Sequence, residues 1–154
     1  MFVSSQTFSA LLGGGVGADQ SCQGLADNAG LGGSWKAWIS DSSSSPSTRF
    51  ARPTTAYTRI DGTLVAMHWA GLTSGALTNS VLTEEHGAPV PNAEVWTATT
   101  TSGTYGGNSC SDWSRNDVSP PYPQVGISDR SSSEWTAAYL QFCDRVARLY
   151  CVEQ

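Results

Sequence analysis

Charge is scarce in this chain of 154 residues, and positive charge is the scarcer kind. Only 14% of the residues are charged, with 8 Lys and Arg against 13 Asp and Glu, which gives a formal net charge of -5. Lys36 is the single lysine. Nucleic-acid binding depends on a basic surface that attracts phosphates. The sequence therefore argues against a nucleic-acid partner.

Long apolar runs are also missing. A membrane-spanning helix needs roughly 20 consecutive, mostly apolar residues, and the aliphatic stretches here are interrupted within a few positions. We therefore expect no membrane insertion. A chain of this length fits one domain with a substantial core. The serine-rich stretch 41–46 is too short for a domain linker, so residues 1–154 are interpreted as a single domain.

Histidines are few, and the short catalytic motifs are absent. The chain holds His68 and His86 and lacks the G-x-S-x-G, H-E-x-x-H, G-x-G-x-x-G and P-loop patterns. His86 follows Glu84 and Glu85, which are metal-ligand types, but we interpret this tripeptide as an exposed polar turn and His68 as a packed or capping residue. We expect a protein that is not an enzyme and has no cofactor or metal.

The chain is instead rich in hydroxyl groups, with 22 Ser and 15 Thr, and it carries four cysteines. Cys22, Cys110, Cys143 and Cys151 form an even set without a C-x-x-C pair, which disfavours zinc knuckles and redox motifs. Two structural disulfides are favoured over four buried free thiols. Because disulfides persist in oxidising compartments, we expect the protein to be extracellular or on a cell surface.

Local patterns in the first half predict one clear helix and two strand segments. Apolar residues at helical spacing predict an amphipathic helix over 18–29, after the glycine-rich run 13–17, with Asp19 in its first turn. Alternation over 35–39 predicts a strand. The Asp-Gly pair inside 57–66 is typical of a β-hairpin turn.

The second half is expected to form strands separated by long irregular loops. Strands are predicted over 94–101, 110–114, 124–128, 137–143 and 147–152, and the loops between them are rich in Gly, Pro, Asn and Asp. The fold class is therefore α+β, a largely antiparallel sheet with one or two helices. Long loops on a small disulfide scaffold are a common place for binding sites.

Several motifs together resemble a known family. They include Gly17-Ala18-Asp19 before Cys22, the run Trp35-Lys36-Ala37-Trp38-Ile39-Ser40, and the final Leu149-Tyr150-Cys151-Val152-Glu153-Gln154. The chain resembles endostatin, the C-terminal domain of certain collagens. It is still more similar to bacterial endostatin-like domains of unknown function in surface lipoproteins of leptospires and deltaproteobacteria.

The resemblance implies a C-type lectin-like (endostatin-like) fold with nested disulfides, Cys22 to Cys151 and Cys110 to Cys143. From the sequence itself, three pairings of the four cysteines are open. The usual lectin calcium site is not expected, because residues 97–103 lack carboxylates and amides. Endostatin's zinc histidines near the N-terminus have no counterpart here either.

The aromatic and polar loop residues are the candidates for ligand contact. Trp35, Trp69, Trp96 and Trp113 fall in family-like motifs and are expected to pack, Trp38 is expected on the face opposite Trp35, and Trp135 and Tyr105 are expected at the surface. The predicted contact surface lies between residues 103 and 123. Its candidate residues are Trp96, Tyr105, Asn108, Asp112 and Arg115.

The resulting hypothesis is a non-enzymatic recognition or adhesion module that binds a glycan or an extracellular protein. Adhesion by the leptospiral relatives implies a protein ligand by resemblance. The alternative is a structural subunit that self-assembles into a surface fibre, coat or appendage. An enzyme is the third and least favoured hypothesis.

Overall fold

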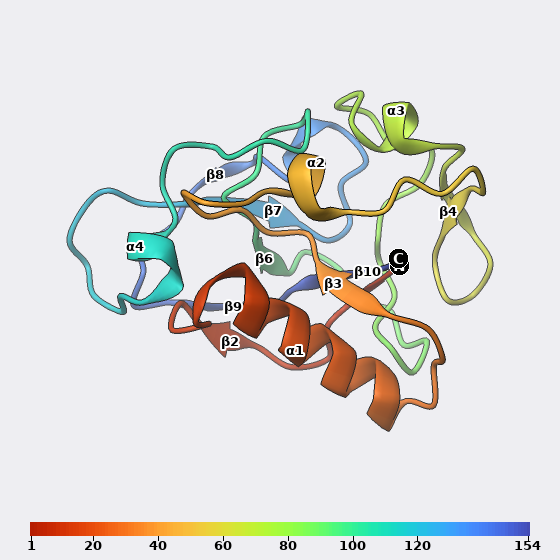
Figure 1. Ribbon diagram of the computed structural model, residues 1–154, viewed down its shortest axis with the longest axis horizontal. Helices are drawn as coiled ribbons and strands as arrows, with labels where there is room; N and C mark the ends of the chain where they lie inside the picture. Colours follow the sequence, from red (N-terminus) through yellow and green to blue (C-terminus); the bar gives the residue numbers. More distant parts are fainter.

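The first and last strands of the chain lie side by side in one antiparallel sheet. The computed structural model describes residues 1–154. Strand β10 (Tyr150–Glu153) is the centre of this sheet and pairs with β1 (Phe2–Val3) and β3 (Trp35–Ala37). In the register, Cys151 stands opposite Phe2 on one side and Ala37 on the other. The sheet therefore joins both ends of the chain to a strand from its first third (Figure 1).

Helix α1 (Gly14–Asn28) packs along β3 and buries Ala18, Cys22 and Leu25. The helix was predicted at this place but begins four residues earlier, inside the glycine-rich run. One of these glycines is required, because a Cβ on Gly17 would lie 1.9 Å from the carbonyl oxygen of Leu12. Because α1 begins at Gly14, Asp19 lies beyond its first turn, and the expectation that Asp19 lies in the first turn is wrong.

The other strands form three further small antiparallel groups rather than one large sheet. The hairpin predicted around Asp61-Gly62 is confirmed, and Gly62 has a φ of +82°. The groups are β4 (Tyr57–Thr58) with β5 (Leu64–Ala66), β2 (Phe8–Ser9) with β9 (Val146–Ala147), and β6 (Glu94–Trp96) with β7 (Gln124–Ile127) and β8 (Tyr139–Leu140).

Short helical turns are more frequent than predicted. Besides α1, the chain forms α2 (Pro46–Arg49), α3 (Trp69–Leu72), α4 (Cys110–Trp113) and the 3₁₀ turn η1 (Ser133–Trp135). The expectation of one or two helices is therefore wrong. The strand predicted over 110–114 is also wrong, because Cys110–Trp113 form the helical turn α4. None of the helices has the length and apolar character needed to cross a lipid bilayer.

Aromatic residues fill two core clusters. Strand β3 and the residues just after it contribute side chains to both clusters. Trp35 belongs to the cluster under α1, whereas Trp38 belongs to the other cluster, so the predicted opposite orientation is confirmed. Trp135 is fully buried against Trp38, with ring centroids 4.8 Å apart. The expectation that Trp135 lies at the surface is wrong, because η1 turns the ring inward after the exposed serine run.

The two disulfides are nested as the resemblance implies. Cys22 pairs with Cys151 across 129 residues, and Cys110 pairs with Cys143 across 33 residues. The first joins α1 to the central strand β10. The second joins α4 to the loop after β8, so each disulfide links a helix to a segment near the C-terminal end of the chain.

Candidate functional site

A polar cleft of about 640 Å³ lies where the N-terminal end of α1 meets the loop 41–45 and α4. Val16 is its single hydrophobic lining residue. Binding sites for small molecules have volumes of roughly 300–1,000 Å³ but are usually mostly apolar. This cleft therefore has the size of a ligand site, and its side chains are mostly hydroxyl and charged groups, set beside the glycine backbone of residues 13–15. Its charged residues are Asp19, Lys36, Asp41, Arg49 and Asp112.

Asp41 forms the floor between the helix end and the serine loop. Its Oδ2 atom accepts a hydrogen bond from the Gly15 N–H at 2.9 Å, and its Oδ1 atom accepts from the backbone and hydroxyl groups of Ser43 and Ser44. Burial works against ionisation of this carboxyl group, but the hydrogen bonds outweigh it and lower the pKa of Asp41. Asp41 is thus a fixed negative charge whose oxygens are already engaged.

Arg49 and Asp19 form an ion pair on the side of the cleft that faces β3. Their closest atoms, Nη1 and Oδ1, are 2.6 Å apart. Asp19 also accepts from the Ala37 N–H, and Arg49 donates to the Ala37 carbonyl oxygen, so both side chains bind the edge of β3. Lys36 donates to the Arg49 carbonyl oxygen at 2.8 Å, which fixes α2 against the same strand.

Asp112 stands at the opposite rim, on α4. Its carboxylate accepts from the Ser42 N–H at 2.8 Å, from the Ser42 hydroxyl at 2.6 Å and from the Ser109 hydroxyl at 2.9 Å. The hydrogen bonds from Ser42 are the main reason that the pKa of Asp112 is lowered. The residue is exposed to solvent, so it presents a fixed carboxylate at the cleft entrance.

The backbone of α4 is left-handed. Cys110, Ser111, Asp112 and Trp113 have φ values of 51°, 54°, 55° and 61°. Non-glycine residues adopt this region at a cost of roughly 1–2 kcal/mol each. The turn is held by the Cys110–Cys143 disulfide and by Trp113, which is fully buried and donates from Nε1 to the Ser40 carbonyl oxygen at 2.8 Å. Tertiary contacts therefore impose the shape of this rim.

Two of the predicted contact residues are connected through one serine. The Tyr105 hydroxyl lies 3.1 Å from the Ser109 hydroxyl, which donates to Asp112. Tyr105 is half-buried and packs against the core rather than standing free in its glycine-rich loop. Asn108 is half-buried beside this chain of hydrogen bonds and forms no side-chain hydrogen bond.

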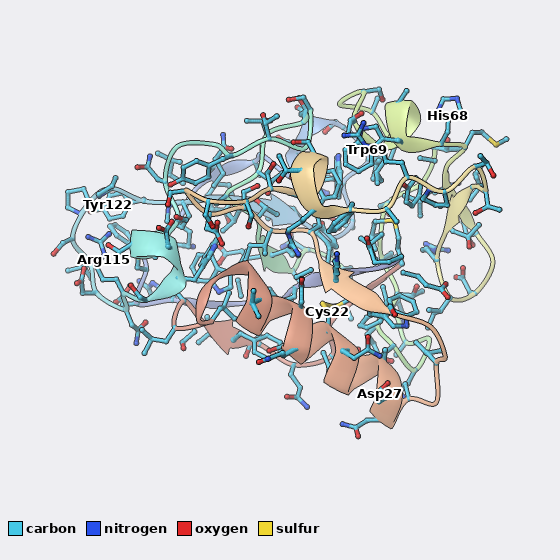
Figure 2. The ribbon with its side chains drawn as sticks, viewed as in Figure 1. Cys22, Asp27, His68, Trp69, Arg115 and Tyr122 are labelled. Carbon is cyan, nitrogen blue, oxygen red and sulfur yellow. A yellow bond between two sulfur atoms is a disulfide. The ribbon has the colours of Figure 1, made fainter.

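Arg115 organises the loop after α4. Its guanidinium group donates to the carbonyl oxygens of Pro120 and Pro121, at 3.1 and 2.8 Å, and it lies 3.4 Å from Cys143 Sγ. Figure 2 shows Arg115 and Tyr122 at the same end of the molecule, beyond α4. The ion pair of Arg115 is with Asp117, at 3.6 Å, and not with Asp112.

Trp96 is predicted to contact a ligand, but its side chain lies in the core. It is fully buried, packs on Trp113 with ring centroids 5.7 Å apart, and donates from Nε1 to the Phe8 carbonyl oxygen. A fully buried ring has no face available to a ligand. Trp96 is therefore corrected to a core residue.

Most of the cleft lies outside the predicted contact surface. Of its charged residues only Asp112 is among the predicted contacts, whereas Asp41, Lys36 and Arg49 are not. A signal was present in Asp41-Ser42-Ser43-Ser44, because an Asp followed by serines is typical of a turn in which the carboxylate accepts from the following residues. The position of that turn against α1 is a tertiary feature that no local pattern reveals.

The two histidines lie away from the cleft. His68 accepts a hydrogen bond from the Gly71 N–H at 3.2 Å and caps α3, so the interpretation as a capping residue is confirmed. His86 is exposed, but Glu84 and Glu85 are buried, so the interpretation of this tripeptide as an exposed polar turn is wrong for the two carboxylates.

Comparison with known proteins places the chain in a family without assigning it an activity. Among curated proteins, a search gives no significant match. A family model described as "Protein of unknown function (DUF1554)" matches residues 5–133, which is most of the chain. The chain therefore belongs to this DUF1554 family of proteins of unknown function.

Proposed function

We propose that the protein is an extracellular, non-enzymatic recognition module that binds a glycan through the polar cleft. The observation that carries this proposal is the cleft itself, with its ligand-sized volume and its lining of carboxylates, hydroxyls and two cations. A polyhydroxylated ligand can both donate to carboxylates and accept from lysine and hydroxyl groups. Asp112, Lys36 and Ser114 are the residues assigned to this contact.

Rigidity of the lining supports the proposal. Asp41 and Asp112 are held by several hydrogen bonds each, and Asp19 is held by Arg49. Groups that are fixed before a ligand arrives lose little conformational entropy on binding. The proposed site therefore presents its polar atoms in a prearranged pattern, as a selective carbohydrate site requires.

Calcium is not part of the proposed interaction. The Thr97 hydroxyl donates to the Thr136 carbonyl oxygen at 2.6 Å, and the Thr99 hydroxyl donates to the Thr97 carbonyl oxygen at 2.6 Å. These oxygens are buried and engaged, whereas Ca²⁺ needs six to eight available oxygen ligands. The proposed contact therefore does not use residues 97–103 and depends on direct hydrogen bonds to the side chains of the cleft.

The proposal includes a C-type lectin-like, endostatin-like fold and a place on the bacterial surface. The nested disulfides and the joining of both ends of the chain by β10 support the fold assignment. The two disulfides also support an oxidising location. A protein ligand at the same face is the alternative form of this recognition hypothesis.

A glycan array with the oxidised protein tests the proposal, in the presence of calcium and of EDTA. The Ser114→Trp variant places a bulky ring at the cleft, and Ser131→Trp is the control on an exposed loop that does not line it. We expect calcium-independent binding that Ser114→Trp abolishes and Ser131→Trp leaves intact. Binding that survives Ser114→Trp would place the site elsewhere, and a blank array would favour a protein ligand or assembly.

A structural subunit is the second candidate, and a surface at strand β8 favours it. Tyr139, Leu140 and Phe142 are exposed by 45%, 57% and 41%, and β8 is an edge strand of its sheet. Exposed edge strands with apolar side chains can pair with another chain. Light scattering over a wide concentration range distinguishes this candidate, because a monodisperse monomer contradicts it.

A further inference from the structure

The hairpin that joins Thr83 to Pro89 brings three residues that can bind a metal ion, two carboxylates and one imidazole, into one tight turn. Thr83 and Pro89 form an antiparallel bridge, and the Glu84 N–H donates to the Ala88 carbonyl oxygen at 2.9 Å. Gly87 has a φ of +91°, which lets the chain reverse in this short loop. Glu84, Glu85 and His86 are therefore consecutive residues around a sharp turn, outside the polar cleft.

Both carboxylates are buried without a cationic partner. Glu84 is 6% exposed and Glu85 is 3% exposed. No nitrogen of Lys, Arg or His lies within 4.0 Å of either carboxylate, since the six ion pairs of the protein involve other acids. Buried carboxylates are normally paired with a cation or bound to a metal. No cationic side chain of the protein therefore pairs with these two carboxylates.

Hydrogen bonds occupy only part of the oxygen atoms. Glu85 accepts from the Ser5 N–H at 2.9 Å and from the Ser5 hydroxyl. Glu84 accepts through Oε1 from the Ala88 N–H at 2.9 Å, and its Oε2 has no hydrogen bond. The hydroxyl of the preceding residue, Thr83, is buried and also lacks a partner. Within this turn the Thr83 hydroxyl is therefore the buried group without a partner, while Oε2 of Glu84 is free of protein hydrogen bonds and open to solvent.

His86 adds a nitrogen from the solvent side. One ligand atom each of Glu84, Glu85 and His86 lie within 4.8 Å of one another. The imidazole is exposed, so an ion can reach the group without opening the core. An imidazole and two carboxylates suit Zn²⁺ and related transition-metal ions, whereas Ca²⁺ and Mg²⁺ prefer sites made of oxygen atoms.

We propose that Glu84, Glu85 and His86 bind one divalent transition-metal ion of the Zn²⁺ class, with water completing the coordination. The ion supplies the positive charge that the buried carboxylates lack. Because Glu85 also binds Ser5, the ion fixes the hairpin against the segment that follows β1. The site is separate from the polar cleft, so it does not depend on the proposed glycan binding.

The chain has two histidines, His68 and His86, so NMR spectra can show which imidazole binds the ion. Tag-free protein is titrated with ZnCl₂, and binding is followed by calorimetry and by the imidazole resonances in NMR spectra. We expect one equivalent of Zn²⁺ to bind and to shift the resonances of His86 while leaving those of His68 in place. The apparent melting temperature should rise with Zn²⁺ concentration, because a ligand of the folded state stabilises it.

Matched variants decide whether the turn is responsible. His86→Ala removes an exposed side chain and Glu84→Gln keeps the shape of the acid, so both variants should fold. Each is expected to weaken Zn²⁺ binding by about tenfold or more, as loss of metal-site groups commonly does, while His68→Ala leaves it unchanged. Absence of Zn²⁺ binding in the unmodified protein, or equal affinity in His86→Ala, overturns the proposal.

Discussion

The carboxylate of Asp41 accepts a hydrogen bond from the backbone N–H of Gly15 at 2.9 Å, across 26 residues of sequence. Gly13, the residue that precedes α1, has no side chain to cap the helix, and the first turn contains no acid. The exposed N–H groups of a helix start favour a negative charge nearby. Asp41 therefore supplies from the serine loop the cap that α1 lacks in its own sequence.

Removing the charge of Asp41 should destabilise the protein in a pH-dependent way. Asp41→Asn replaces one accepting oxygen by an amide that must face N–H donors, and we expect a loss of about 1–2 kcal/mol at neutral pH. The pKa of Asp41 is lowered below its ordinary value of 3.8, so its stabilising effect is present above that value and is lost as pH falls through the folded-state pKa.

Urea unfolding from neutral pH down to about pH 3 measures this effect. The difference between the wild type and Asp41→Asn should be largest at neutral pH and should shrink once the unfolded-state carboxyl begins to be protonated. Asp144→Asn is the control, because Asp144 lies at the surface, 3.9 Å from Arg145. A difference that stays constant over the whole range would contradict the role of the Asp41 charge.

Two glycines of α1 should respond to alanine in opposite directions. A Cβ on Gly17 would lie 1.9 Å from the Leu12 carbonyl oxygen, whereas nothing lies within 4 Å of a Cβ on Gly24. Gly24→Ala should stabilise the protein by about 1 kcal/mol through helix propensity alone. Gly17→Ala should destabilise it by about 1–3 kcal/mol, because the segment before α1 must move away. Equal effects in thermal unfolding would show that the two segments do not meet at Gly17.

The parts of the fold that sequence alone predicted are those with local causes. The hairpin around Asp61 and Gly62 was found because the pair itself favours the turn. The buried face of α1 was found because Cys22 and Leu25 repeat at helical spacing. The start of α1 at Gly14 is not predicted, because glycines normally break helices. The need for glycine at position 17 comes from the contact with Leu12, which no helical pattern reveals.

Features with distant causes were not predictable in this way. Cys110 and Trp113 have no local preference for a left-handed turn, and they adopt it because the disulfide and the Ser40 contact hold them there. Trp135 was expected outside because serines precede it, yet its place in the core is set by Trp38. The cleft could not be predicted for the same reason, since Ser42 and Asp112, which are hydrogen-bonded at its rim, are 70 residues apart in the sequence.

Removing each disulfide should affect stability by different amounts. In the loop-entropy model, the Cys22–Cys151 bond, which spans 129 residues, contributes at most about 5 kcal/mol, and the Cys110–Cys143 bond, which spans 33 residues, at most about 4 kcal/mol. The second loss should be smaller still, because breaking that bond lets α4 leave its left-handed conformation. Urea unfolding of the two double-serine variants should give this order, and the reverse order would contradict it.

The left-handed conformation of α4 makes Ser111 a position where glycine should be the better residue. Ser111 has a φ of 54°, is exposed, and its hydroxyl forms no hydrogen bond. A non-glycine residue pays roughly 1–2 kcal/mol in this conformation, while glycine loses about 0.5–1 kcal/mol more backbone entropy on folding. Ser111→Gly should therefore stabilise the protein by about 0.5–1 kcal/mol. Ser21→Gly, in the right-handed helix α1, is the matched control and should destabilise it by about 0.5 kcal/mol. Opposite signs in urea unfolding are the result expected of a left-handed α4, and a loss of stability in Ser111→Gly would contradict this conformation.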